Sequence, residues 1–193
     1  MRSPLAAAGL LWLAWVVSWT VARLWADRAA ARPDLRRQLP YFALIVAGAV
    51  LLFGSKVAGW PDWTSWRTGP AAGWALLGCV ALGLSFTWWA RLHLGRLWSS
   101  SVTRKAEHRI VDTGPYGLVR HPIYTGLMLA ALATGVLRGN VLALAGAVVL
   151  VFGVYLKARL EEGFLREQMN PGEYDAYARR VPMLVPFARR VRR

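Results

Sequence analysis

The 193-residue sequence has little cysteine and little negative charge. Its one cysteine, Cys79, excludes an internal disulfide, and its three histidines follow no metal-ligand spacing. Ten acidic residues face 24 Lys and Arg, so the formal charge is +14. That charge would suit a nucleic-acid-binding protein, but unbroken apolar runs point to a membrane instead. Disorder is excluded too, because 56% of the residues are hydrophobic.

Five apolar runs are long enough, or nearly so, to cross a bilayer as helices of about 20 residues. We therefore expect an all-α, polytopic membrane protein with about five transmembrane helices: Pro4–Trp25, Tyr41–Ala58, Pro70–Leu92, Pro122–Leu137 and Val141–Leu156. The last two, joined by a short turn, should form an antiparallel hairpin followed by a tail. The fourth run is short, because 16 residues span only about 24 Å of a hydrocarbon core about 30 Å thick.

The distribution of cations predicts the orientation of these helices. Twenty of the 24 Lys and Arg residues fall in the first loop with its flank, in residues 91–120, or in the tail from Lys157. Five crossings place all three regions on one side, which the positive-inside rule makes cytoplasmic. The N-terminus is then outside and the C-terminus is cytoplasmic. Tryptophans of the outer loop should form an interfacial belt, and His93 should lie at an interfacial helix end: Trp60, Trp63 and Trp66.

One candidate site stretch precedes the fourth run. The Gly114-Pro115 turn leads to Arg120 and His121, and Pro122 suits the first turn of a helix. Arg120 and His121 would then lie beside the N–H groups of a helix N-terminus, which favours a bound carboxylate. The ring of Tyr124, within the first turn, would attract a cationic group.

A second stretch ends the fifth run. The adjacent carboxylates of Glu161 and Glu162 are costly if desolvated at a membrane boundary. One of them would pair with Lys157 or Arg159, and the other would be available to a ligand. Because the hairpin returns to its starting side, His121 and the two carboxylates should lie at one membrane face on neighbouring helices. We therefore predict a binding or catalytic site between the two stretches.

These stretches resemble the isoprenylcysteine carboxyl methyltransferase and phospholipid methyltransferase superfamily. The resemblance covers the C-terminal half from Trp98 and rests on His108-Arg109-Ile110-Val111, Gly114-Pro115-Tyr116, Arg120-His121-Pro122-x-Tyr124-x-Gly126, Asn140, Glu161-Glu162-x-x-Leu165 and Tyr174-x-x-Tyr177-x-x-Arg180-Val181-Pro182. It implies an integral membrane enzyme that uses S-adenosylmethionine. Residues 98–193 would form its catalytic core, with two transmembrane helices and a cytoplasmic tail, and residues 1–97 would add about three N-terminal helices.

The resemblance also implies roles for individual residues. Glu161 or Glu162 would close the site, and a basic residue before them, here Lys157 or Arg159, would hold an acidic group of the substrate. The family pattern has an arginine in that role. The expected cofactor-binding residues lie before and at the start of the fourth helix: His108, Ile110, Val111, Tyr116, Arg120, His121, Pro122 and Tyr124.

The methyl acceptor stays open at this point. A carboxylate or thiol acceptor is already anionic, whereas an amine or alcohol needs a base, for which a glutamate is suitable. The expected partners are the bilayer and a lipophilic or small-molecule acceptor, with no nucleic acid and no metal. Two other functions are compatible with the sequence: an intramembrane NADPH-dependent reductase of enones or sterols, and a membrane scaffold without catalysis.

Overall fold

The computed structural model describes residues 3–22, 24, 35–54, 64–95, 111–168 and 172–188. Within these ranges the regular elements are helices, apart from one isolated antiparallel bridge between Ser65 and Asn140. The helices are α1 (Pro4–Ala22), α2 (Leu35–Gly54), α3 (Pro70–Leu94), α4 (Pro115–Leu118), α5 (Pro122–Leu137), α6 (Val141–Gln168) and α7 (Glu173–Arg180). The predicted all-α fold is confirmed.

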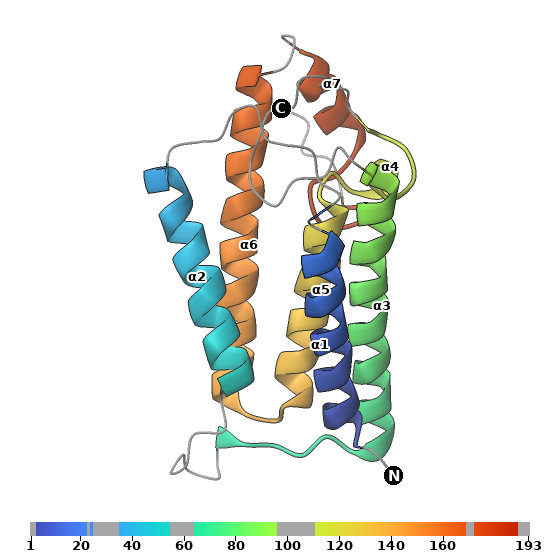
Figure 1. Cartoon of the computed structure of the whole chain (residues 1–193), viewed down its shortest axis with the longest axis vertical. Coiled ribbons are helices and arrows are strands. Elements are labelled where there is room, and N and C mark those ends of the chain that lie inside the picture. Colours follow the sequence, from blue (N-terminus) through green and yellow to red (C-terminus); the bar gives the residue numbers. More distant parts are fainter. Residues whose placement is uncertain are drawn as a thin grey trace.

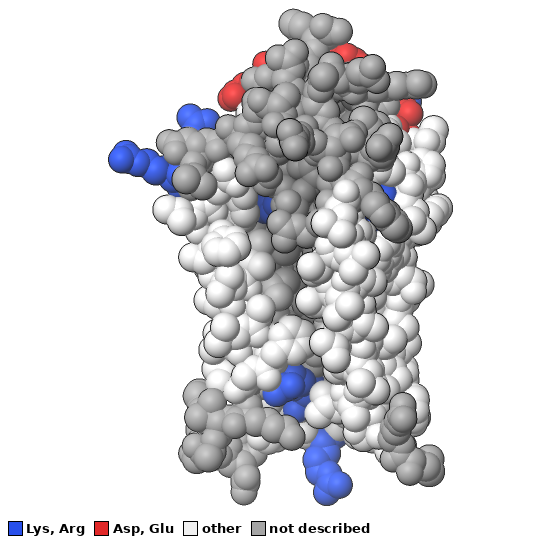
Figure 2. Space-filling model, viewed as in Figure 1, with Lys and Arg blue, Asp and Glu red and all other residues white. Residues whose placement is uncertain are grey.

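Five apolar helices run side by side along the long axis of the molecule (Figure 1). Four of them, α1, α2, α3 and α6, are long and apolar enough to cross a membrane, and the 16-residue α5 is shorter. Charged side chains gather toward the two ends of the face shown in Figure 2, whereas the middle of that face carries other residues. The protein is therefore a polytopic membrane protein, as predicted.

The bounds of α5 agree with the sequence prediction, but other helices extend beyond their apolar runs. α2 begins at Leu35 rather than Tyr41, and α6 continues to Gln168 rather than ending at Leu156. Apolar length measures the part of a helix that suits hydrocarbon, and good helix formers such as Leu, Glu, Arg and Lys continue α6 into a polar region. The predicted ends Trp25 and Ala58 lie outside the described residues.

Glycines bring the helices into close contact in two pairs. α2 packs against α6, and α3 packs against α5. A methyl group added to Gly146 of α6 would meet the backbone nitrogen of Leu52 and would lie 2.8 Å from the carbonyl oxygen of Gly48. Gly83 and Gly126 face each other in the same way between α3 and α5. Small residues at such contacts allow helices to pack closely where no hydrophobic effect operates between them in lipid.

α1 is attached to this framework by tryptophan side chains. The indole nitrogen of Trp12 donates to the hydroxyl of Thr134 in α5 (2.9 Å), and that of Trp15 donates to the hydroxyl of Thr87 in α3 (2.7 Å). Hydrogen bonds of this kind satisfy polar groups that hydrocarbon cannot solvate. They therefore fix the rotation of α1 against α3 and α5.

Arg91, one of the cations assigned above to the cytoplasmic loop, is buried at the end of α3. Its side chain donates to the carbonyl oxygens of Gly95 (2.5 Å) and Ala22 (2.9 Å). These carbonyls lie beyond the last turn of α3 and at the end of α1, where intrahelical donors are missing. Arg91 therefore joins two helix ends and is not exposed to lipid headgroups.

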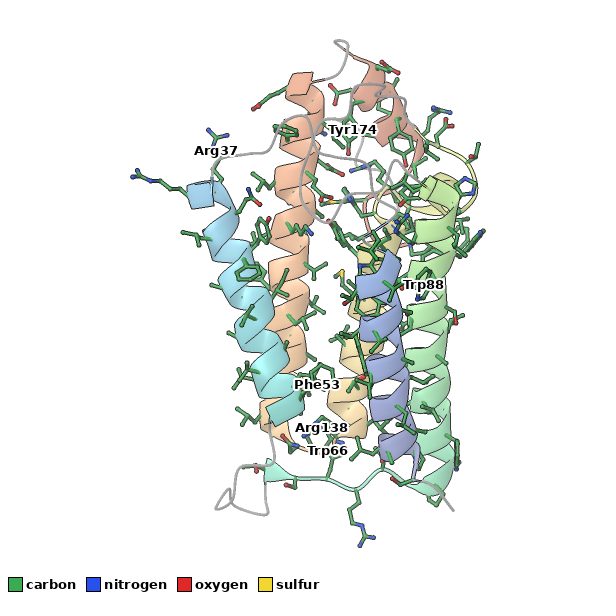
Figure 3. All side chains as sticks on the ribbon, in the orientation of Figure 1. Arg37, Phe53, Trp66, Trp88, Arg138 and Tyr174 are labelled. Carbon is green, nitrogen blue, oxygen red and sulfur yellow. The ribbon has the colours of Figure 1, made fainter. Side chains whose placement is uncertain are left out.

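The opposite end is closed by Trp66, which contacts the α5–α6 turn. Its indole donates to the carbonyl of Val136 (3.1 Å), and its backbone nitrogen donates to the carbonyl of Gly139 (2.8 Å). Trp66 and Arg138 lie at the same end of the bundle, opposite Tyr174 (Figure 3). Trp66 thus holds the hairpin turn, whereas the other two tryptophans of the predicted belt, Trp60 and Trp63, lie outside the described residues.

The α2–α6 contact gives a first prediction. We expect Gly146→Ala to lower the free energy of unfolding by about 1–3 kcal/mol, because its methyl group meets backbone atoms that cannot move away separately. Gly78→Ala in α3 is the matched control, since nothing lies within 4 Å of the added methyl group. Thermal unfolding of both variants in the same detergent tests this. Equal stability of the two variants would contradict the close contact.

Candidate active site

The imidazole of His121 lies between the two adjacent carboxylates of α6. Its Nε2 is 3.3 Å from Oε1 of Glu162, and its Nδ1 is 3.6 Å from Oε2 of Glu161. Consecutive residues of a helix point about 100° apart, so a ring inserted between Glu161 and Glu162 can address both. His121 is the N-cap residue of α5 and is 8% exposed. The hairpin prediction that placed His121 beside the glutamates is consistent with this contact.

Arg120 also binds the Glu162 carboxylate. Its Nε and Nη2 lie 2.7 and 2.6 Å from Oε1 of Glu162. Its Nη1 donates to the carbonyl oxygens of Ala178 (3.0 Å) and Val181 (2.6 Å), at the end of α7. The guanidinium is thus surrounded by acceptors within the protein. In this arrangement Arg120 links α6 to α7, and its donors are already used rather than presented to a ligand.

Glu161 and Tyr124 form a second part of the cluster. The Tyr124 hydroxyl donates to Oε1 of Glu161 (2.6 Å), and the Tyr124 ring lies parallel to His121 with centroids 5.5 Å apart. The Nζ of Lys157 is 5.3 Å from the centroid of Tyr124 and 6.0 Å from that of Tyr41 in α2. Both distances fall in the range of cation–π contacts. A cation, two aromatic rings and a carboxylate therefore lie together at one end of α6.

Arg159 does not join this cluster. It is exposed, and its Nη1 donates to the Tyr155 hydroxyl (3.3 Å) on the same helix. Arg159 is two positions before Glu161, about 200° around the helix, whereas Lys157 is four positions before it, about one full turn away on the same side. Of the two basic residues considered for the substrate, the structure brings Lys157 to the site and directs Arg159 away from it.

The segment before α5 is held against the end of α3. His93 hydrogen-bonds Thr113 through its Nε2 (2.9 Å) and stacks on Tyr116 with centroids 6.4 Å apart. Gly114 has φ 56°, and a Cβ there would lie 2.7 Å from the His93 ring. Glycine is therefore required at this position by backbone conformation and by space. His93 lies in the last turn of α3, at a helix end as expected, and its ring also contacts Tyr116.

The residues after α7, which we call the C-terminal strap (residues 181–188), cover the start of α5. The backbone nitrogen of Arg120 donates to the carbonyl of Pro182 (2.8 Å), and that of His121 donates to the carbonyl of Met183 (3.1 Å). The Thr125 hydroxyl donates to the carbonyl of Leu184 (2.6 Å). The strap therefore holds the backbone of the two residues that contact Glu162.

Burial and hydrogen bonding set the protonation of the cluster. Burial alone would lower the pKa of His121, but hydrogen bonds and charge from Glu161 and Glu162 outweigh it, so the pKa of His121 is raised above its ordinary value. Burial raises the pKa of Tyr116 and of Tyr177. These phenols therefore stay neutral, and the Tyr177 hydroxyl donates to the backbone carbonyl of Tyr116 (2.8 Å).

The other residues expected to bind the cofactor lie in different parts of the chain, and some of them are described. Pro122 is buried at the first position of α5, as its role in starting a helix requires. Val111 is half-buried at the start of the described linker, whereas His108 and Ile110 lie outside the described residues. Among the described residues, no group of three or more His, Cys, Asp or Glu side chains could hold a metal ion.

Two neighbours of the cluster were missed by the sequence reasoning. Tyr41 begins the second apolar run, and the predicted topology already placed that end of the run on the same side as the site. Arg166 lies one turn after Glu162 and bridges it (3.9 Å) to Asp175 of α7 (2.9 Å). The four-residue spacing from Glu162 was the available signal for this ion pair.

The part of the chain that is similar to known proteins includes the cluster described above. Residues 76–166 match the isoprenylcysteine carboxyl methyltransferase (ICMT) family. The probable protein-S-isoprenylcysteine O-methyltransferase of Oryza sativa subsp. indica is 30% identical over 111 residues, which cover 58% of this chain and 53% of the relative. The protein-S-isoprenylcysteine O-methyltransferase of Schizosaccharomyces pombe is 33% identical over 119 residues (58% and 48%).

A bacterial relative carries a different name. The cobalt-zinc-cadmium resistance protein CzcN of Cupriavidus metallidurans is 33% identical over 96 residues, which cover 48% of this chain and 43% of the relative. The chain spans about half the length of the relatives it matches. The family match begins within α3, upstream of Trp98, and it includes α5 and nearly all of α6. The cluster of His121, Tyr124, Glu161 and Glu162 lies inside the matched residues, so the part of the chain that carries the candidate site is similar to the isoprenylcysteine carboxyl methyltransferase family.

Proposed function

We propose that this protein is an integral membrane methyltransferase that takes a methyl group from S-adenosylmethionine. The acceptor is a lipophilic or small molecule with a carboxylate, amine or thiol, bound at the cytoplasmic membrane face. One observation carries the proposal: two distant motifs supply His121, Tyr124 and the two glutamates to one buried cluster, with Lys157 beside it. The rice and yeast relatives, whose names describe O-methyltransferases, support the same reaction type.

The cluster fits this cofactor, which when bound supplies a methyl group on a positively charged sulfur. Aromatic faces and a carboxylate favour a cation of that kind, and Tyr116, Tyr124 and Glu161 offer them. His121 and Pro122 lie at the same helix start, and Val111 stands at the edge of the linker. We assign Arg120 a positioning role, because its guanidinium already binds Glu162 and two backbone carbonyls.

The residues of the chain then have separate tasks. Lys157 attracts an acidic group of the acceptor, while the Tyr124 hydroxyl orients the Glu161 carboxylate. Methyl transfer is an in-line displacement, so the main requirement is to hold the acceptor atom and the methyl carbon in line at about 3 Å. An amine acceptor would also need to lose a proton, for which Glu161 is the nearest carboxylate to Lys157 along the same helix face.

Three arginines beside the described site are already paired with carboxylates, which disfavours a reductase that binds NADPH. The polyphosphate of that cofactor needs uncompensated cations. Around the described site, Arg120 is matched by Glu162, Arg166 by Asp175 and Arg180 by Asp112. A scaffold without catalysis is also disfavoured, because it would not need two adjacent buried carboxylates, which are costly at a membrane boundary.

The proposed orientation follows from the distribution of Lys and Arg among the loops and the tail. The site lies at the end of the bundle that carries α7, opposite the start of α1 (Figure 1). The positive-inside rule makes this end cytoplasmic, where soluble S-adenosylmethionine is available. A lipophilic acceptor would then enter laterally from the bilayer, and the cofactor would enter from the aqueous side.

Transfer of a labelled methyl group tests the proposed reaction. The purified protein in nanodiscs, given S-adenosylmethionine with a labelled methyl group and a membrane lipid extract, should label an extractable product. S-adenosylhomocysteine should inhibit this reaction, and NADPH should not. We expect Glu161→Gln to reduce the rate by about tenfold or more, since charge-assisted hydrogen bonds are lost. A folded wild-type protein that neither labels a product nor binds S-adenosylhomocysteine would refute the proposal.

The two basic residues of α6 provide a matched pair for the acceptor. Lys157→Gln should raise KM for an acidic acceptor by about tenfold, because one charged contact is removed. Arg159→Gln should change KM by less than about twofold, since Arg159 faces away from the cluster. Steady-state kinetics with the labelled product from the previous experiment measure both. The reverse ranking would show that Arg159 holds the acceptor.

The raised pKa of His121 predicts a dependence of stability on pH. The folded state binds this proton more tightly than the unfolded chain does. The resulting stabilisation is complete below the unfolded pKa of about 6.5 and is lost as pH rises through the higher folded pKa. The Tm of the wild type should therefore fall as pH rises above neutrality, and His121→Gln should flatten this part of the profile. An unchanged slope in the variant would assign the effect to another group.

A further inference from the structure

The C-terminal strap ends in a tight turn with an unusual residue at its tip. The backbone nitrogen of Ala188 donates to the carbonyl of Val185 (3.2 Å), Pro186 is the second residue of the turn, and Phe187 is the third with φ 61°. Proline followed by a positive φ defines a type II turn, in which the third position favours glycine. A bulky aromatic residue in this backbone region is uncommon.

The side chain of Phe187 gains no compensating burial within the protein. It is 91% exposed, and Val185 at the start of the same turn is 64% exposed. The other aromatic residues of this region, Tyr174 and Tyr177, are buried between α7 and its neighbours. A local choice that disagrees with the backbone and makes no internal contact is typical of a functional position. The contact of Phe187 is therefore expected outside the chain.

The depth of the turn indicates what that contact is. α5 has 16 residues, about 24 Å, so its start lies inside or at the edge of a hydrocarbon core about 30 Å thick. The strap is attached one turn further along α5, where the Thr125 hydroxyl donates to Leu184. α6 continues well beyond this level (Figure 1). We therefore expect Val185 and Phe187, only a few residues past Leu184, to lie near the boundary between hydrocarbon and headgroups.

The sequence next to the turn carries the complementary charge. Four of the five residues after Ala188, which lie outside the described residues, are arginines: Arg189, Arg190, Arg192 and Arg193. An exposed aromatic residue followed by clustered cations is the composition of segments that bind anionic membrane surfaces.

We propose that the turn 185–188 anchors the strap to the bilayer surface, and that the positive charge of the arginines after it in the sequence favours anionic lipids. Phe187 inserts beside the acyl chains. Because the strap also accepts the backbone hydrogen bonds of Arg120 and His121, lipid binding at the turn stabilises the start of α5. The lipid composition of the membrane thereby affects how firmly Arg120 and His121 are held against Glu162.

A depth measurement tests where Phe187 lies. In a Cys79→Ala background, Phe187→Cys carries a nitroxide, and each nanodisc holds one chain, so that no second copy covers the label. We expect the label to be protected from an aqueous nickel chelate and accessible to oxygen when the lipids include phosphatidylglycerol. A label at Arg179→Cys, on exposed α7, is the water-accessible control. Equal exposure to the chelate at both positions would overturn the anchor.

The link to the site needs a second variant. Phe187→Gly suits the positive φ, so it should not lower the Tm in detergent. In phosphatidylglycerol nanodiscs it should make the backbone amides of Arg120 and His121 exchange hydrogen several-fold faster. Replacement of the four terminal arginines by glutamine should do the same, with no effect in phosphatidylcholine. Unchanged exchange in both variants would overturn the proposal, and neither readout depends on methyl transfer.

Discussion

The adjacent carboxylates of Glu161 and Glu162 are the constraint on which the rest of the site depends. They lie on α6 near a membrane boundary, so each needs a donor or cation. They diverge around the helix, and only a group placed between them can serve both. His121 takes that place, which in turn fixes the start of α5. Arg120, the next residue back, completes the neutralisation of Glu162 and binds the end of α7.

The short α5 explains why a C-terminal segment is needed there. A helix of 16 residues does not reach as far as its neighbours, and the space above it must be filled by groups that satisfy its N-terminus. Proline at its first position removes one donor, and strap carbonyls accept from the residues just before it. The glycine contacts of α3 with α5 and of α2 with α6 keep the axes of these helices close together. The short length of α5 therefore explains how the strap comes to lie at the end of the bundle that holds the candidate site.

Sequence patterns predicted the parts of this protein that depend on apolar length and on chain connection. Uninterrupted runs located the five apolar helices, and the hairpin argument placed His121 near Glu161. They did not predict the extension of α6, because polar helix ends depend on propensity and partners rather than hydropathy. The internal use of Arg120 was also missed, since its acceptors are backbone carbonyls of the tail, which have no signature in side-chain patterns.

Helical phase alone distinguishes Lys157 from Arg159, because four residues return to the face of Glu161 and two do not. Lys157 also differs in chemistry from the arginine that the family pattern has in this role. Arginine presents a rigid planar fork that matches the two oxygens of a carboxylate, whereas lysine presents one compact charge on a flexible stem. In its proposed role, Lys157 beside Tyr41 and Tyr124 would select for negative charge but would impose little geometry on the group that carries it. The family match therefore constrains the reaction more strongly than it constrains the shape of the acceptor.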